Sequence, residues 1–385
     1  MKKILIVIRW LEVWIGSEKA AINIWDWLYH KWHNVNYLTI YETHNKYPHK
    51  WKETCLNEKV NLNIFVKLLR LLTRSYKIKK YCKKNNIDIV ISHIEDINIF
   101  SILSKILYRN TSKIIVVNHN LLDYSPNIIK KLVKLFYNYA DRIITTTYEN
   151  RNNFIQDYWV IPEKIKTIHN MIDIESINEK LLWEVEKWDT HLFENNRFTF
   201  VNIGRLSFQK NHELLLWAFE KLYQENNNVQ LIILWQWELK EKLENQISSY
   251  RSKDNIYFLW IRNNPLPYLK MSHGFVLSSR YEWFALALIE AMQAWLPIIT
   301  TDHRTGWKEL LRKNCETFEQ VKTISHEDYG ILVPNFDEEF LKDAMLQIIS
   351  DTSSQEKYQQ KSLMRYKDFD KKIILGIWND VIENI

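Results

Sequence analysis

The chain has 385 residues and a mass of 46.8 kDa, enough for two domains that each bury a core. It is 46% hydrophobic and 25% charged with a net charge of +6, which excludes disordered and fibrous proteins. Its 6 glycines stand against 17 tryptophans, whereas an average chain of this length would hold about 27 glycines.

Strand-like and helical segments alternate in the first half of the chain. The apolar run 3–8 predicts a buried strand, and the pattern over 17–31 predicts a helix after a loop. Further strands are expected at 34–41, 87–92, 113–118 and 142–146. Strands that alternate with helices predict a parallel sheet with crossover connections. The charged, patternless stretch 175–196 is expected to be a linker.

The alternation restarts after this stretch. Strands are expected at 198–203, 229–234, 256–259, 274–277, 297–300 and 331–333, and helices at 211–225, 238–250 and 284–294. We therefore predict an α/β protein with two Rossmann-like domains, at 1–175 and 196–365. Ligands of such folds bind at the carboxyl ends of the strands.

The segment 67–84 is strongly basic, with eight lysine or arginine residues and no acidic residue. On a helix it would be both basic and apolar, as expected for adhesion to an anionic membrane surface. A solvated basic helix that packs its leucine face on a core is an equally good interpretation. Nucleic acid is a weaker alternative, because no recognised binding motif accompanies the charge.

The chain carries no sign of secretion. The early apolar run 4–8 ends at Arg9 and is too short for a signal peptide or a membrane span. Three scattered cysteines, Cys55, Cys82 and Cys315, form no zinc or disulfide pattern. Both observations favour a reducing cytoplasm as the location.

Candidate ligand-binding residues follow two strands of the second half. Arg205 and Lys210 would place two cations beside a helix N-terminus, which suits a pyrophosphate, although isolated surface cations would look the same. Glu282 and Glu290 are eight residues apart, so on one helix their carboxylates would share a face. A glutamate buried among apolar residues, as expected for Glu290, is costly unless it is paired or meets a ligand.

The loop after the first strand keeps a single glycine, Gly16. A glycine in such a strand-to-helix turn lets backbone amides approach a phosphate or a sugar. One glycine is a weak signal, and an ordinary helix start is the alternative interpretation.

Together these segments resemble the retaining family 4 glycosyltransferases of GT-B fold. The motifs that match are Gly204-Arg205 with Lys210, Glu282-x7-Glu290-Ala-Met and His169-Asn170-x-x-Asp173. The segments 31–35, 295–302 and 305–310 match as well. It covers nearly the whole chain. It implies two Rossmann-like domains facing across a cleft, the first binding the acceptor and the second the donor. It also implies a last helix, 366–385, that returns to the N-terminal domain.

The resemblance further implies transfer of a hexosyl or N-acetylhexosaminyl group. The expected donor is a nucleotide-diphosphate sugar, with UDP as the expected nucleotide, and the expected acceptor is a glycan or lipid-linked glycan of a cell-surface polysaccharide. The expected enzyme is cytoplasmic, or peripheral on the inner membrane face, and needs no metal or other cofactor. A non-catalytic carbohydrate-binding protein, a degenerate GT-B protein and a GT-B sugar-nucleotide epimerase are the alternatives.

Individual roles follow from the matched positions. Arg205 and Lys210 would neutralise the donor diphosphate in place of a metal, and Glu290 would bind the donor ribose. Glu282 and His119 would lie against the transferred sugar as the catalytic residues. The remaining matches assign the backbone at Ala285 and Leu286 to phosphate, the Arg262 loop to the nucleotide base, and Gly16 to an acceptor or phosphate loop.

Departures from the family pattern are nearly all of one kind: tryptophan stands where the family has glycine. The positions are 32, 235, 237, 260, 283 and 295. Because drift would scatter the replacements over many residue types, we hypothesise that UGA codons for glycine have been translated as tryptophan. Authentic tryptophans that stack on sugars are the competing explanation. In the printed sequence we expect crowding around 235, 260 and 283.

Overall fold

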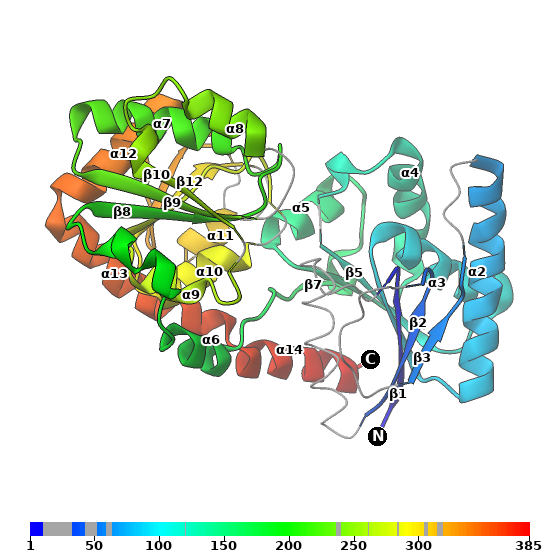
Figure 1. Cartoon of the computed structure of the whole chain (residues 1–385). Coiled ribbons are helices and arrows are strands. Elements are labelled where there is room, and N and C mark those ends of the chain that lie inside the picture. The colour runs from blue at the N-terminus through cyan, green and yellow to red at the C-terminus, as the bar shows by residue number, and fades with distance from the viewer. Residues whose placement is uncertain are drawn as a thin grey trace. The chain divides into compact units, whose positions relative to one another are not determined.

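The computed structural model describes residues 1–10, 33–42, 52–58, 64–119, 121–235, 240–260, 262–282, 285–303, 307–313 and 319–385. The chain divides into two compact units (Figure 1). Unit 1 is Met1–Asn170 with Ile374–Ile385, and unit 2 is Met171–Ile373. Over the described residues, each unit is built on one seven-stranded sheet. The helix expected at 17–31 lies outside the described residues.

The sheet of unit 1 has the order β3-β2-β1-β4-β5-β6-β7, and all its neighbouring strands are parallel. Its strands are β1 (Lys3–Ile8), β2 (Asn34–Thr39), β3 (Lys52–Cys55), β4 (Ile89–His93), β5 (Lys113–Asn118), β6 (Arg142–Thr145) and β7 (Ile165–Thr167). The expected strands correspond to β1, β2, β4, β5 and β6. The short edge strands β3 and β7 were not expected, because each holds too few apolar residues to make a pattern.

Helices cover the sheet of unit 1. The longer ones are α2 (Ile64–Asn85), α3 (Glu95–Tyr108), α4 (Asn127–Phe136), α5 (Tyr148–Gln156) and α14 (Lys371–Glu383), of which α14 begins in unit 2. Leu5 and Val90 of the strands pack with Phe100 of α3 on one face of the sheet. Ile4 and Ile6, which point to the opposite face, are fully buried too. Burial on both faces explains why the strands are continuous apolar runs.

The sheet of unit 2 has the order β10-β9-β8-β11-β12-β14-β13, parallel except for the last pair. Its strands are β8 (Phe198–Ile203), β9 (Val229–Trp235), β10 (Ile256–Trp260), β11 (Gly274–Leu277), β12 (Ile298–Asp302), β13 (Ser325–His326) and β14 (Ile331–Pro334). The strand order reverses between β8 and β11. In open parallel sheets, the carboxyl ends of the strands at such a reversal form the ligand-binding crevice.

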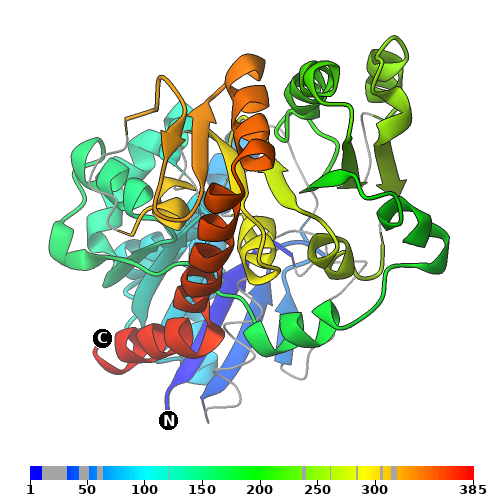
Figure 2. The same ribbon diagram turned by 90° about the vertical axis from the view of Figure 1, so that its left-hand side faces the viewer.

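Both faces of this second sheet are covered by helices. They are α6 (Ile174–Leu181), α7 (His212–Glu225), α8 (Lys240–Ile247), α9 (Leu266–Lys270), α10 (Leu286–Gln293), α11 (Trp307–Leu311), α12 (Glu338–Ser350) and α13 (Thr352–Arg365). Phe200 and Val276 pack with α7, α8 and α12 on one face. Val201 and Phe275 pack with α6, α9 and α10 on the other. Figure 2 shows α13 lying next to α10, with which it is in contact.

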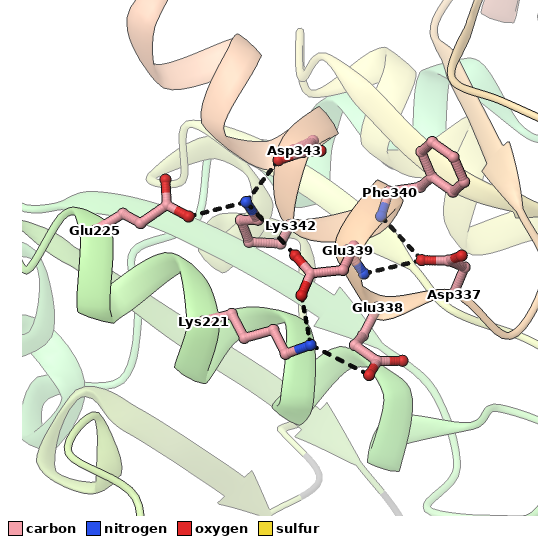
Figure 3. Close-up of polar contacts among 8 residues, drawn as sticks. All are labelled: Lys221, Glu225, Asp337, Glu338, Glu339, Phe340, Lys342 and Asp343. Carbon is pink, nitrogen blue, oxygen red and sulfur yellow. Dashed lines mark hydrogen bonds and ion pairs between the residues drawn. The ribbon is translucent and has the colours of Figure 1, made fainter.

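An ion-pair network joins α7 to α12 on the surface of unit 2 (Figure 3). Its members are Lys221 and Glu225 of α7 and Glu338, Glu339 and Lys342 of α12. Lys221 Nζ lies 3.2 Å from Glu338 Oε1 and 2.7 Å from Glu339 Oε1. Lys342 Nζ lies 2.8 Å from Glu225 Oε1. Ion pairs at a protein surface contribute about 0–1 kcal/mol each, so the network links the two helices but adds little to stability.

The expectation of a linker over 175–196 is wrong. This stretch forms α6 and the 3₁₀ helix Lys187–Phe193, and it belongs to unit 2. Ile177, Leu181 and Leu192 are buried in its core. The charged residues lie between these apolar positions, which hid the amphipathic spacing. The units divide instead at Asn170 and at Ile373, and the helix expected from 366 begins, as α14, at Lys371.

Candidate functional site

Lys210 and Glu282 meet at the carboxyl ends of β8 and β11, where the strand order reverses. Lys210 Nζ lies 2.6 Å from Glu282 Oε1, and the two side chains are only 13% and 7% exposed. Ser279 Oγ donates a hydrogen bond of 2.8 Å to the same carboxylate oxygen. A cation and a carboxylate are therefore held side by side in a largely desolvated position, where their interaction with a ligand would be strong.

The loops that carry these two residues are hydrogen-bonded to each other. The Arg280 amide donates to the Gln209 carbonyl (2.8 Å), and the Gln209 side chain donates to the Tyr281 carbonyl (3.1 Å). Ser278 Oγ donates to the Lys210 carbonyl (3.1 Å). Because the loops after β8 and β11 are fastened in this way, the separation of Lys210 and Glu282 is built into the fold.

Two buried histidines stand close to the Lys210 charge. Burial lowers the pKa of His212 to about 3, and the positive charge of Lys210 acts in the same direction. His303 follows β12; burial, then Lys210 and Lys308, lower its pKa well below the usual value. Both rings are therefore neutral at pH 7. Lys210, and Arg205, which is exposed, are cations that follow β8 at this edge.

The N-terminus of α10 opens at the same edge. Ala285 is its N-cap residue, with φ −85° and ψ 99°, and the alanine side chain makes no capping hydrogen bond. Leu286 is the first helical residue. The amides of the first turn and the helix dipole make this end a place where an anion is stabilised.

Two expectations about the glutamates are wrong. Glu282 precedes α10, so it does not share a helix face with Glu290. Glu290 is partly exposed, because α10 uses other residues to pack against the sheet. Those packing residues are Leu288, Ile289, Ala291 and Met292. Glu290 thus lies on a partly exposed side of α10.

Arg262 is engaged elsewhere in unit 2. Its Nε and Nη2 donate to Asp189 at 2.8 and 3.1 Å, and Nη1 donates to the Trp260 carbonyl. Asp189, which is 4% exposed, also accepts a hydrogen bond from Tyr268. The Arg262 guanidinium therefore anchors the 3₁₀ helix Lys187–Phe193, and it does not join Lys210 and Glu282.

His119 lies in unit 1, directly after β5. Its Nε2 is 3.0 Å from Nδ1 of His93, the last residue of β4. Burial lowers the pKa of His119 to about 4, so the ring is neutral at pH 7. Gly16 lies outside the described residues. Each unit thus presents polar side chains where its central strands end.

The sequence interpretation missed three residues of these edges: Ser279, His93 and His303. Each comes one or two residues after the buried part of a parallel strand, or ends that strand. Polar residues in that position of a parallel sheet indicate a ligand site, because ligands bind at the carboxyl ends of the strands. The signal was present and could have been used.

No group of three or more His, Cys, Asp or Glu side chains is placed to hold a metal ion within the described residues. Metal independence remains a prediction.

Comparison with known proteins identifies the family. A family model described as "Glycosyl transferases group 1" matches residues 185–363, and one described as "Glycosyltransferase Family 4" matches residues 33–176. An uncharacterized glycosyltransferase of Methanocaldococcus jannaschii is 32% identical over 94% of this chain and 96% of the relative. The chain belongs to the family 4 glycosyltransferases.

Two other proteins are similar to this glycosyltransferase over most of its length. One is the N-acetylgalactosamine-N,N'-diacetylbacillosaminyl-diphospho-undecaprenol 4-alpha-N-acetylgalactosaminyltransferase of Campylobacter jejuni, 25% identical over 80% of each chain. The other is HepE of Anabaena. Its crystal structure in complex with UDP matches with a TM-score of 0.78 and 16% identity over 100% of both chains. The structural likeness shows the GT-B fold, as expected from the sequence.

Proposed function

We propose that this glycosyltransferase moves a sugar, with retention at the anomeric carbon, from a UDP-linked donor to a lipid-linked glycan. The observation that carries the proposal is the Lys210–Glu282 pair beside the N-terminus of α10. The Campylobacter relative, named for a diphospho-undecaprenol acceptor, supports the acceptor class. The UDP of the Anabaena structure supports the nucleotide. Transfer of a hexosyl or N-acetylhexosaminyl group into a polysaccharide is part of this proposal.

In the proposed complex the donor diphosphate lies on Arg205, Lys210 and the first amides of α10, at Ala285 and Leu286. These groups would stabilise the negative charge that develops on the leaving nucleotide, which is the largest contribution many enzymes make to catalysis. Donor binding gives Lys210 a second anionic partner and leaves Glu282 to accept a hydrogen bond from a sugar hydroxyl. The two cations would then do the work of a metal ion.

The other predicted contacts have specific places in the proposal. Glu290, on a partly exposed side of α10, would bind the donor ribose. His119 would contact the transferred sugar. Since the Arg262 guanidinium is held by Asp189, we assign contact with the nucleotide base to the backbone that follows it. Gly16 keeps its proposed place in an acceptor or phosphate loop.

A donor screen tests the proposal. The panel is UDP-glucose, UDP-galactose, UDP-N-acetylglucosamine and UDP-N-acetylgalactosamine, with diphospho-undecaprenol-linked sugars as acceptors and release of UDP as the readout. Transfer with an α-anomeric product from an α-linked donor is expected. A sugar-binding protein without turnover, a product epimerised in the sugar ring, or an inverted anomer would each contradict it.

We further propose that several tryptophans of the printed sequence are glycines encoded by UGA. Trp295 supports this most directly, because it has a φ of 69°, a region that glycine occupies without strain. Its amide donates to the Met292 carbonyl, and the Leu296 amide donates to the Ala291 carbonyl, both at 3.1 Å. These bonds form a Schellman motif with Trp295 at the position that is usually glycine.

Other tryptophans give a mixed pattern that fits partial recoding. Trp159 also has a positive φ, 56°, and is 69% exposed. Trp378 of α14 is 1% exposed and fills a core, as an authentic tryptophan does. The crowding expected at Trp260 is wrong: this residue ends the edge strand β10 and is 45% exposed. Trp283 and the side chain of Trp235 lie outside the described residues.

Sequencing and mass spectrometry decide the recoding. UGA codons at 32, 235, 237, 260, 283 and 295, with glycine masses in peptides of the native protein, are expected; UGG codons would contradict the proposal. The donor screen is therefore run on the printed sequence and on a six-glycine form, which carries glycine at these six positions. Turnover should be confined to, or much faster in, the six-glycine form.

Helix α2 supports a peripheral membrane location. Part of its charge is structural, since Glu58 accepts hydrogen bonds from Arg74 Nε (2.9 Å) and Lys77 Nζ (3.1 Å). The exposed face carries apolar residues in its first half and lysines in its second. These are Leu69, Leu72 and Tyr76, then Lys80, Lys83 and Lys84. Such a face suits an anionic lipid surface.

No helix among the described residues is long and apolar enough to cross a membrane. On the basis of the exposed face of α2, we propose attachment at the bilayer surface, which would bring the enzyme to a lipid-linked acceptor.

A further inference from the structure

The paired imidazoles of His93 and His119 form an unusual contact in unit 1. β4 and β5 are parallel neighbours, with His93 paired in register to Val117. His93 Nδ1 and His119 Nε2 are 3.0 Å apart, and the ring planes are inclined by 16°. The residues are 1% and 7% exposed, so water does not compete for this hydrogen bond.

The backbone next to His93 is strained. Ile94 has φ 77° and ψ 142°, a conformation that a β-branched residue rarely adopts. Its amide donates to the Val117 carbonyl (3.3 Å), and its carbonyl accepts from the Asn98 amide (2.9 Å) to open α3. This turn takes the chain off the sheet directly after His93 and keeps the ring of His93 beside β5. Strain of this kind persists where the surroundings enforce it, and it is common at functional sites.

One proton must serve the two facing nitrogen atoms. Burial lowers the pKa of both rings, and the neighbouring His119 lowers that of His93 further, so both are neutral. A neutral imidazole has one N–H. If His93 Nδ1 carries the proton, His119 must carry its own on Nδ1; if His119 Nε2 carries it, His119 Nδ1 is an acceptor. The tautomer of one ring therefore determines the tautomer of the other.

His119 Nδ1 is the ring nitrogen of His119 that does not face His93. It is buried, and none of the described residues makes a hydrogen bond to it. A buried polar atom without a partner costs about 1–3 kcal/mol, and such an atom in a native structure calls for an explanation. A ligand hydroxyl, which can donate or accept, would satisfy it in either tautomer.

We propose that His93 is a positioning residue, which orients the His119 ring and determines whether its Nδ1 donates to or accepts from a sugar hydroxyl. This inference rests on the proposed role of His119 in facing the sugar. His93 itself does not touch the substrate. It acts on the reaction through the hydrogen bond to His119 Nε2.

The first test reads the tautomer directly, without substrate. The protein is labelled with ¹⁵N-histidine, and the His119 ring signals are identified by their loss in His119→Asn. One defined tautomer is expected in the parent protein. His93→Phe and His93→Leu, which remove the hydrogen bond but keep apolar volume, should give a tautomer mixture. His93→Asn, which keeps a polar atom near the place of Nδ1, should retain one tautomer. Unchanged His119 signals in both His93→Phe and His93→Leu would overturn the proposal.

The second test measures turnover with the UDP-sugar that reacts fastest in the donor screen. His93→Phe should lower kcat roughly tenfold, as expected for one lost hydrogen bond to a reacting group, and His93→Asn should restore most of it. His119→Ala separates the two claims. If His119→Ala keeps full activity, the proposed contact of His119 with the sugar is refuted. The tautomer experiment still decides whether His93 determines the tautomer of His119. If His119→Ala is inactive but His93→Phe is fully active, only the inference on His93 fails.

Discussion

Trp295 offers the sharpest test of the glycine hypothesis in a folded protein. Replacement by glycine and by alanine both remove the indole ring, so the two variants differ only in a methyl group at a residue with a φ of 69°. A left-handed conformation costs a residue with a Cβ about 1–2 kcal/mol. Glycine avoids this cost but loses about 0.5–1 kcal/mol through greater freedom of the unfolded chain. We expect Trp295→Gly to be more stable than Trp295→Ala by about 0.5–1 kcal/mol.

Trp217 provides a matched control. It lies inside α7 and is 45% exposed, compared with 61% for Trp295. In a helix interior glycine is less favourable than alanine by about 1 kcal/mol, so Trp217→Ala should be the more stable variant of its pair.

Urea unfolding of the four variants, followed by circular dichroism, measures the difference. The order of glycine and alanine should reverse between the two sites. Alanine equal to or more stable than glycine at 295, with the expected order at 217, would refute the argument from backbone strain.

Four further outcomes are expected. Glu282→Ala and Lys210→Ala should each lower kcat/KM of the active form by about 100-fold or more, since each removes a charged contact of the donor site; full activity of either variant would remove it from that site. Excess EDTA should leave initial rates unchanged, and loss that Mg²⁺ restores would contradict metal independence. The triple variant of Lys80, Lys83 and Lys84 to glutamate should weaken binding to phosphatidylglycerol vesicles in a salt-dependent way. The control triple variant of the exposed residues Lys253, Lys270 and Lys357 has the same net charge and should bind normally. Burial raises the pKa of Glu95 from 4.5 to about 7. Between these two pH values the folded state holds a proton that the unfolded state has lost. The free energy of unfolding should therefore fall by about 3 kcal/mol as the pH rises from 4.5 to 7. Glu95→Gln should abolish this loss in urea titrations at pH 4.5 and 8, and an unchanged pH dependence would show that Glu95 is not its source.

Most of the fold was predictable, because both sheets are buried on two faces and their strands read as apolar runs. Lys113–Asn118, Phe198–Ile203 and Gly274–Leu277 have the predicted limits. The failures include short edge strands, β3, β7 and β13, and the helix α6, in which Ile177 and Leu181 stand among charges; α12 and α13 were not predicted either. Charge density misled the prediction at α6.

The candidate site was predictable in part. Strand ends and spacing led to Lys210 and Glu282, and the structure brings these two together. Helical spacing gave the wrong geometry for Glu290, since it was applied across Glu282, although the helix expected at 284–294 already begins after that residue. Arg262 could not be assigned because its partner, Asp189, lies 73 residues away in the chain. The His93–His119 contact likewise depends on strand pairing between residues 26 apart.

The hydrogen bonds between the loops after β8 and β11 determine which substitutions the Lys210–Glu282 pair tolerates. At positions 280 and 281 they use an amide and a carbonyl, which every residue other than proline can supply. These two bonds do not depend on the side chains at 280 and 281, whereas the side chains of Gln209 and Ser278 each make a bond between the loops. Replacing Gln209 or Ser278 with alanine would therefore loosen the contact between the loops, and with it the separation of Lys210 and Glu282.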